Sequence, residues 1–478
     1  MTLSWIDIAV IGLYLLVMIG IGLWARNKVK NLADYALAGR SLGYIIMIGT
    51  LVGGAIGAAS TLGKGGRAYE TGIIFAVVAF GYIAGLIVFA FFAKKLRQVQ
   101  IWTIPEVLRI RYGKGLELAF GAAMFISVVA LFGAQVIAIG MLFTSVGQSL
   151  GLTYTSVIII SGAILIFYTL IGGLLAVAYT DLIQSIIMLI SVGIILPIFV
   201  IAGPIQQGNF WELLKPDTGN ILGGMTPLYI ISIFIIDFSF CLIDPSLWQR
   251  ANAAKDEKVI KNSMLVTAGV YFYWSAVIVI MGVIGVALVP NLVHDFGSTD
   301  AIIPVLAVKF LPPGLLGFCF AGLMAVMMST ASVVLLIAGT TVANDIIKPL
   351  RPKMSDRGLL FTAMGTVLVV GIISVACALF MKGIFNTLML AFAVYVSGVF
   401  VPVMAACYWD KATRQGAVAS SVTATVICVG LYAVKQFVDL PWIEPIVFSL
   451  LASIIIMFTV SRATYKPDQA TPKLFTSK

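Results

Sequence analysis

The sequence contains little charge, because Asp, Glu, Lys and Arg make up 10% of its 478 residues while hydrophobic residues make up 61%. A soluble domain usually has about a quarter of its residues charged. The mean hydropathy of +1.08 points the same way and excludes a soluble globular protein. The chain is therefore expected to be an integral membrane protein.

Histidine and cysteine are also scarce. The single histidine, His294, falls in a stretch expected to be a loop, so catalysis or metal binding by histidine has little basis. The five cysteines form no CxxC pair and lie in apolar stretches, where they are most simply small core residues. These residues predict neither an enzyme nor an organic cofactor.

Long apolar stretches recur along the whole sequence, and each is long enough to cross a bilayer as a helix. With the N-terminus outside, 24 of the 30 Lys and Arg residues fall on the inner side, as the positive-inside rule requires. This distribution predicts a plasma-membrane protein with a cytoplasmic C-terminus, and it explains the net charge of +10 without a nucleic acid partner. We count thirteen stretches, centred near residues 4–25, 42–63, 71–93, 117–149, 154–175, 178–202, 226–248, 264–289, 314–343, 359–381, 385–408, 415–434 and 443–461.

Two of these stretches contain residues that interrupt membrane helices. The second has five glycines between residues 49 and 63, and the seventh has Asp237 and Asp244 followed by Pro245. Paired interruptions indicate the inverted repeats of many secondary transporters. If the first helix is peripheral, the second and seventh stretches each open a unit of five helices. The alternative for the second stretch is that its glycines only allow close helix packing.

Three residues within the apolar stretches suggest an ion site. Ser329 and Thr330 are adjacent hydroxyls in the ninth stretch, and sodium prefers oxygen ligands such as hydroxyls and freed backbone carbonyls. Hydroxyls that bond a carbonyl one turn back are the alternative. Asp181 opens the sixth stretch, where an acid needs a partner or a function unless it complements a helix start at the interface.

Taken together and in their order along the chain, these motifs resemble the sodium:solute symporter family over residues 4–461. The motifs are the glycine-rich second stretch, residues 172–184 with Thr180-Asp181, Asp244 with Gln249-Arg250, and Met328-Ser-Thr with Asn344-Asp345, supported by Thr103-Ile-Pro-Glu and Arg111-Tyr-Gly. The resemblance implies an all-α, thirteen-helix fold of the leucine-transporter type with a 5+5 inverted repeat. It assigns a peripheral helix and inner loop to 1–41, the two repeats to 42–203 and 204–410, two further helices to 411–462 and a cytoplasmic tail to 463–478.

The resemblance also implies where sodium binds. By position, the main sodium site falls on the carbonyls of Gly53, Ile56 and Val326 and the hydroxyls of Ser329 and Thr330. Asp181 matches the acid beside that site, which in some members helps to hold a second sodium. One position departs from the family's proline carriers, which have an acid where this chain has Ala55.

The solute is expected near the midplane between the two broken helices. Gln135 is either an interhelical hydrogen bond or a solute contact, and Asp237 either favours an amine-bearing solute or bridges to a neighbouring helix. Lys64 and Arg67, at the outer end of the second stretch, attract anions or anchor at the headgroups. The candidate solute residues are Ala55, Ser60, Gln135, Asp237, Phe240, Cys241 and Asp244.

The sequence thus predicts a sodium-coupled symporter that imports a small polar organic solute by alternating access and works as a monomer. The solute is an amino acid, a quaternary amine, a vitamin, a sugar or a monocarboxylate. Proton coupling through Asp181 is the nearest alternative. A channel is less well supported, because the sequence has no continuous polar pore and no repeated filter loops.

Overall fold

The computed structural model describes residues 3–26, 31–99, 101, 103–113, 116–144, 153–206, 222–379, 384–435, 437–438, 443–466 and 474. Within these residues the chain is helical, with one isolated bridge between Leu42 and Ala254 and no strand. Ten helices are long and apolar enough to cross a membrane, or eleven with one bent pair, and Ser127–Phe143 and Thr155–Phe167 are shorter apolar helices. The expectation of an all-helical, multi-pass membrane protein is therefore confirmed, while the count of thirteen stays a prediction. Most of the expected tail 463–478 lies outside the described residues.

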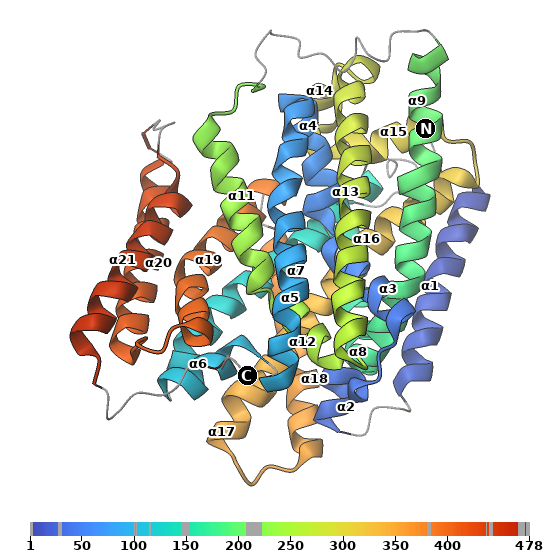
Figure 1. The fold of residues 1–478 in the computed structure, drawn as a ribbon. Coiled ribbons are helices and arrows are strands. Elements are labelled where there is room, and N and C mark those ends of the chain that lie inside the picture. The colour runs from blue at the N-terminus through green and yellow to red at the C-terminus, as the bar shows by residue number, and fades with distance from the viewer. Residues whose placement is uncertain are drawn as a thin grey trace.

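The first half of the chain runs from α1 to α9 (Figure 1). Its elements are α1 (Trp5–Arg26), α2 (Leu32–Leu37), η1 (Ala38–Arg40), α3 (Tyr44–Ala55), η2 (Ala59–Gly63), α4 (Lys64–Thr71), η3 (Ile73–Val78), α5 (Ala79–Val99), α6 (Ile104–Tyr112), α7 (Leu116–Thr144), α8 (Tyr154–Ile190), η5 (Ser191–Ile195) and α9 (Leu196–Gln206). The short α6 begins as the sequence predicts, because the Thr103 hydroxyl caps it and Pro105 occupies its first turn.

The second half runs from α11 to α21. Its elements are α11 (Pro227–Leu242), α12 (Pro245–Ala253), α13 (Glu257–Leu288), α14 (Leu292–Phe296), η6 (Thr299–Ala301), α15 (Ile302–Phe310), α16 (Leu315–Thr341), η7 (Val342–Ile347), α17 (Lys348–Leu350), α18 (Asp356–Ala378), α19 (Ile384–Tyr408), α20 (Arg414–Lys435) and α21 (Pro445–Thr464). The stretch expected to be a loop around His294 instead folds into α14, η6 and α15.

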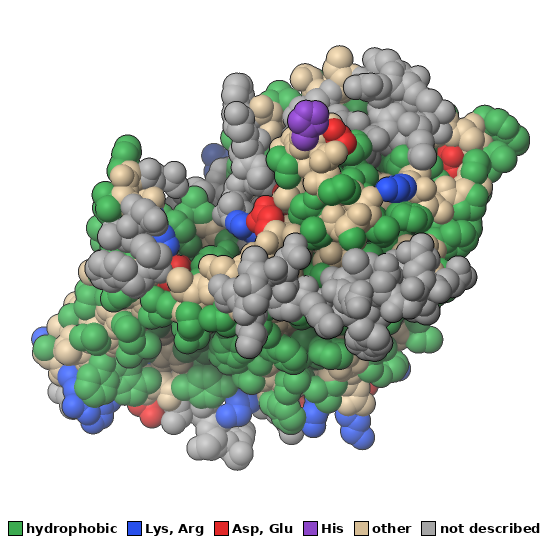
Figure 2. All heavy atoms as spheres, turned by 90° about the horizontal axis from the view of Figure 1, so that it is seen from above, with side chains coloured by type: hydrophobic (Ala, Val, Ile, Leu, Met, Phe, Trp, Pro, Cys, Tyr) green, Lys and Arg blue, Asp and Glu red, His purple; other side chains and the backbone are tan. Residues whose placement is uncertain are grey.

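Helix α16 is the centre of the bundle. In an apolar 18-residue segment of the span Leu315–Leu350, which contains α16, 94% of the residues are buried. Helix α16 packs against α1, α3, α7, α8 and α18. By contrast, α20 and α21 pack chiefly on each other and lie at one side of the molecule, far from α1 (Figure 1). In the corresponding 18-residue segments of α20 and α21, only 22% and 33% of the residues are buried, as is typical of lipid-facing helices. Seen from above, the histidine lies beside acidic side chains, and hydrophobic side chains cover much of the visible surface (Figure 2).

Two helix breaks position the site. The segments Tyr44–Ala55 and Ala59–Thr71 are bent by 62° relative to each other, which confirms the interruption predicted for the second apolar stretch. The seventh stretch is interrupted between α11 and α12, where Asp244 caps the new helix and Pro245 begins it. Both interruptions place non-helical backbone inside the bundle, where it is tolerated only when its polar groups find partners.

A third break divides α8. Gly173 has φ of 56°, and a Cβ at this position would lie 2.7 Å from the Tyr35 ring. Only glycine satisfies both conditions, because it has no Cβ and adopts positive φ readily. This break separates the fifth and sixth predicted stretches, and it places Asp181 inside the second segment of α8.

Candidate functional site

The break after α3 frees backbone carbonyls. In an uninterrupted helix the Gly57 N–H would bond the Gly53 carbonyl. Here the Gly57 N–H instead donates to Ser60 Oγ at 2.9 Å, and the Ala58 N–H donates to Gln135 Oε1 at 3.0 Å. The N–H groups of the break are therefore satisfied by side chains, and the carbonyl of Gly53 is left available.

The freed carbonyls face two hydroxyls of α16. Ser329 Oγ lies 2.8 Å from the Gly53 carbonyl oxygen and 3.1 Å from that of Val326. Thr330 Oγ1 lies 3.4 Å from the Gly53 oxygen, 3.3 Å from the Ile56 oxygen and 3.4 Å from the Val326 oxygen. The structure thus brings together all five residues that the resemblance indicates. The hydroxyls also bond one turn back, but they bridge α16 to the broken helix as well. Such a group of neutral oxygens suits a hard monovalent cation.

Gly57 leaves room for this arrangement, because a Cβ there would lie 2.7 Å from Thr330 Oγ1. Gly57→Ala is expected to displace the Thr330 hydroxyl and to weaken sodium binding by about tenfold, which corresponds to roughly 1.4 kcal/mol. Sodium titration of thermal stability measures this effect. The control is Gly365→Ala, where nothing lies within 4 Å of the added Cβ. Equal sodium affinity in the two variants would show that the Thr330 position is irrelevant to the ion.

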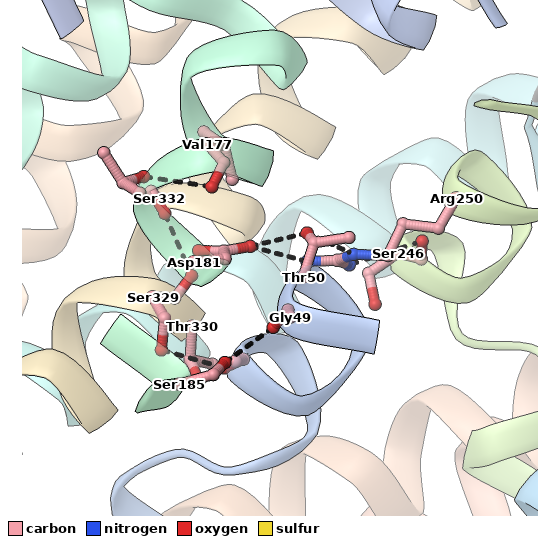
Figure 3. A network of polar contacts seen from close by, with 12 residues as sticks. Gly49, Thr50, Val177, Asp181, Ser185, Ser246, Arg250, Ser329, Thr330 and Ser332 are labelled. Carbon is pink, nitrogen blue, oxygen red and sulfur yellow. Dashed lines mark hydrogen bonds and ion pairs between the residues drawn. The ribbon is translucent and has the colours of Figure 1, made fainter. Parts of the chain in front are cut away.

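Asp181 lies beside this cluster and is fully buried (Figure 3). Its Oδ2 accepts a hydrogen bond from Thr50 Oγ1 at 2.6 Å and lies 3.4 Å from Arg250 Nη2. Its Oδ1 has no hydrogen-bond partner among the described residues. A Cβ on Gly53 would lie 3.2 Å from both Asp181 Cβ and Ser329 Cβ, so the acid is next to the hydroxyl. The interpretation of Asp181 as an interfacial helix start is wrong, because it is buried inside α8.

Arg250 is the partner of Asp181 that sequence reasoning missed. The sequence assigns it to an inner loop, but its side chain is 1% exposed and lies in α12. Arg250 Nε also donates to Thr50 Oγ1 at 3.0 Å, so three residues from α3, α8 and α12 form one buried network. A buried acid in a membrane needs a cation or hydrogen-bond donors as partners, and this requirement could have predicted a buried basic residue near Asp181.

A cavity of about 1060 Å³, part of it open to solvent, lies between the two broken helices. Six of the seven expected solute residues line it: Ala55, Ser60, Gln135, Asp237, Phe240 and Asp244. Cys241 does not, because its side chain is fully buried against Gly85, where an added Cβ would lie 2.5 Å from Cys241 Cβ. Thr330 lines the same cavity, so the candidate ion and solute sites are adjacent.

Several lining residues also have structural roles. Gln135 and Ser60 hold the broken backbone, so the interhelical hydrogen bond expected for Gln135 is present in addition to its exposure to the cavity. Asp244 Oδ1 accepts from the Ser246 N–H at 2.8 Å and caps α12. Asp237 lies inside α11 and not at its start, so it does not cap that helix.

The sequence does not place Lys64, or any aromatic residue besides Phe240, in the solute site. Lys64 lines it and is 3% exposed, so its interpretation as a headgroup anchor is wrong. Arg67 instead lies near the surface and pairs with Glu70 at 2.8 Å. The aromatic side chains that line the cavity in addition to Phe240 are Tyr82, Tyr271, Phe392 and Tyr395. Lys64 lies a few residues after the break, so the bend carries it into the cavity wall.

Close contacts join the two halves of the chain at the α2 end of the bundle. Gln249 Nε2 donates to the Ala36 carbonyl at 2.7 Å, and Asn252 Nδ2 donates to the Ile101 carbonyl at 2.7 Å. The main chain adds two bonds, from Lys255 N to the Leu42 oxygen at 2.9 Å and from Leu42 N to the Ala253 oxygen at 3.2 Å. These bonds hold the two halves of the chain together at this end of the bundle.

Helices broken beside a cavity inside a helical bundle are a feature of secondary transporters. Solved structures of similar fold include transporters of the leucine-transporter type. A Na+-coupled sialic acid symporter in a substrate-bound outward-open state matches with a TM-score of 0.81 at 19% identity, covering 98% of this chain and 99% of that one. Mhp1, a nucleobase-cation-symport-1 family transporter, matches with a TM-score of 0.60 at 14% identity, covering 93% and 96%. The described residues therefore have the leucine-transporter-type fold.

The sequence comparisons identify the family. The model of the sodium:solute symporter family matches residues 35–424. A sodium/proline symporter of Staphylococcus aureus (strain NCTC 8325 / PS 47) is 27% identical over 497 residues, which cover 97% of this chain and 94% of that protein. The chain belongs to the sodium:solute symporter family. It is accordingly a transporter and not an enzyme.

Proposed function

We propose that this protein couples the inward movement of sodium to the import of a small polar organic solute. The observation that carries the proposal is the convergence of three carbonyls and two hydroxyls at the break of the second span. Sodium would bind to Gly53, Ile56, Val326, Ser329 and Thr330, with Asp181 as the neighbouring acid. The solute would bind in the adjacent cavity lined by Ala55, Ser60, Gln135, Asp237, Phe240 and Asp244.

Sodium would act by joining two elements. Its ligands come from the broken α3 and from α16, so an occupied site holds these helices together and orders the wall that carries Thr330. Solute binding is then stronger with sodium present, and by reciprocity sodium binding is stronger with solute present. The sodium gradient supplies the work, since about 2.3 kcal/mol is available per charge for each 100 mV of membrane potential.

The proposal includes a topology. Thirteen spans place the N-terminus outside and the C-terminus in the cytoplasm, and two inverted five-helix repeats occupy residues 42–203 and 204–410. Residues 1–41 form a peripheral helix and inner loop, 411–462 two further helices and 463–478 a cytoplasmic tail. On this assignment the contacts of Gln249 and Asn252 close the cytoplasmic side, and they must separate before solute is released.

Among relatives the named solutes are small. One relative is a sodium/proline symporter, and one structural neighbour is a Na+-coupled sialic acid symporter. Ala55 replaces the acid expected of the proline carriers, which favours a different solute from proline. Proton coupling remains the second candidate, because Asp181 has one carboxylate oxygen without a hydrogen-bond partner among the described residues.

A solute screen by thermal shift tests the proposal. Purified protein in sodium chloride is expected to gain several degrees in Tm with its solute, and to gain clearly less in potassium chloride, because sodium and solute binding are coupled. The same comparison at several pH values tests proton coupling. Equal stabilisation in both salts, with a dependence on pH instead, would contradict sodium coupling and favour the proton.

A further inference from the structure

Two opposite charges face the same cavity without contacting each other. Lys64 at the start of α4 and Asp237 in α11 both line the cavity between the broken helices. They interact electrostatically, but within the described residues they do not form an ion pair. The Lys64 side chain is buried and Asp237 is half-buried, and neither has an ion-pair partner in direct contact among the described residues, which is costly unless a ligand supplies one.

Within the described residues, the Lys64 ammonium hydrogen-bonds only to neutral groups. Its Nζ lies 2.9 Å from Ser275 Oγ and 3.5 Å from the Tyr271 hydroxyl, and 4.8 Å from the centre of the Tyr271 ring. An ammonium has three donors, so at least one is left for an acceptor in the cavity. A carboxylate is the acceptor that also neutralises the charge.

The Asp237 carboxylate is the corresponding acceptor. The nearby Asp244 is occupied, because its Oδ1 caps α12 through the Ser246 N–H. The described part of the chain contains no hydrogen-bond donor to Asp237. Of the two acids of the seventh span, Asp237 is therefore the one available to an ammonium group.

Much of the remaining cavity wall is apolar and aromatic, beside polar residues such as Ser60, Gln135 and Thr330. Phe240 and Phe392 stack with ring centres 4.0 Å apart, and the Tyr82 and Tyr271 rings lie 4.8 Å apart. Such walls suit the hydrocarbon part of a solute, and their ring faces also tolerate a nearby ammonium.

We infer that the solute is a zwitterion whose carboxylate binds Lys64, whose ammonium binds Asp237 and whose apolar part contacts the aromatic wall. The inference rests on the proposed transport function. A zwitterion pairs both cavity charges and adds no net charge. An anion would leave Asp237 unpaired and would be repelled by its carboxylate. A cation would leave Lys64 unpaired and would be repelled by its ammonium group.

The test uses matched sets of probes on the purified full-length protein in saturating sodium. One set is L-phenylalanine, hydrocinnamate and phenethylamine, and the other is L-leucine, isocaproate and isoamylamine, with β- and γ-amino acids added to vary the spacing of the charges. In each matched set the zwitterion is expected to bind about tenfold more tightly or better than the acid or the amine. Titration of Tm gives the affinities.

Charge-neutralising variants change the relative affinities for zwitterion, acid and amine, which the loss of a purely structural role would not do. In Lys64→Met, zwitterion and amine are expected to bind about equally, while the acid stays weak. In Asp237→Asn, zwitterion and acid become about equal, while the amine stays weak. The matched controls are the exposed Lys309→Met and Asp295→Asn, which should keep the preference for zwitterions.

The outcomes separate this inference from the transport proposal. If no zwitterion stabilises the wild-type protein, or if the acid alone or a neutral sugar stabilises it as strongly, the inference is overturned. A larger gain in sodium than in potassium with such a solute would leave sodium coupling intact. Should the variants not fold, the wild-type comparison of the matched probes still decides the matter.

Discussion

Ser329→Ala combined with Thr330→Ala is expected to raise the sodium concentration for half-maximal solute binding by roughly thirtyfold. Each hydroxyl contributes about 1 kcal/mol as an oxygen partner, and about 2 kcal/mol in total corresponds to that factor. The helix itself should persist, because alanine is the best helix former. Solute affinity at a fixed, low sodium concentration should fall in parallel, since the coupling is reciprocal.

The measurement is solute binding across a sodium titration, in protein reconstituted in vesicles or in detergent. The control is Ser374→Ala in α18, whose buried hydroxyl donates only to the Val370 carbonyl one turn back. An unchanged sodium requirement in the double variant would place the ion elsewhere in the molecule, whatever happens to solute affinity.

Arg250→Met is expected to destabilise the protein by about 3–5 kcal/mol, because it leaves the buried Asp181 carboxylate without its cation. Adding Asp181→Asn should recover most of this loss, since the amide carries no charge and still accepts a hydrogen bond from Thr50. Unfolding free energies of the two single variants and the double variant form a cycle that isolates the pair.

The exposed Arg357→Met at the start of α18 serves as the control and should change stability by less than about 0.5 kcal/mol. Strictly additive costs of the Arg250 and Asp181 changes would show that the two groups are not coupled in the folded protein. Coupling that survives only at low salt would indicate a solvent-accessible network, contrary to the burial of both side chains.

The sequence predicted those parts of the site that depend on the backbone. Glycines around Gly53 and the Asp244-Pro245 step indicate interrupted helices. Adjacent hydroxyls at Ser329 and Thr330 indicate oxygen ligands. The helix break after α3 and the hydroxyls that face it could therefore be predicted from the sequence. The cap of α6 followed from capping rules in the same way.

The sequence did not predict which charges are buried. Lys64 and Arg250 were assigned to the two membrane faces, because basic residues at span ends usually lie at the headgroups. A bend of 62° in one helix and a break in another turn these side chains into the bundle instead. Cys241 was misplaced for a related reason, because the side chains of one helix turn point to different neighbours. Hydropathy does not show whether a side chain faces the cavity or packs against Gly85.

The bridge between Leu42 and Ala254 makes the state of the transporter visible to hydrogen exchange. The amides of Leu42 and Lys255 are bonded across the two halves of the chain, not within a helix. Such amides exchange with solvent only when those halves separate, whereas helix amides nearby also require the helix to open. Their deuterium uptake therefore reports the opening of this end directly and without any label on a side chain.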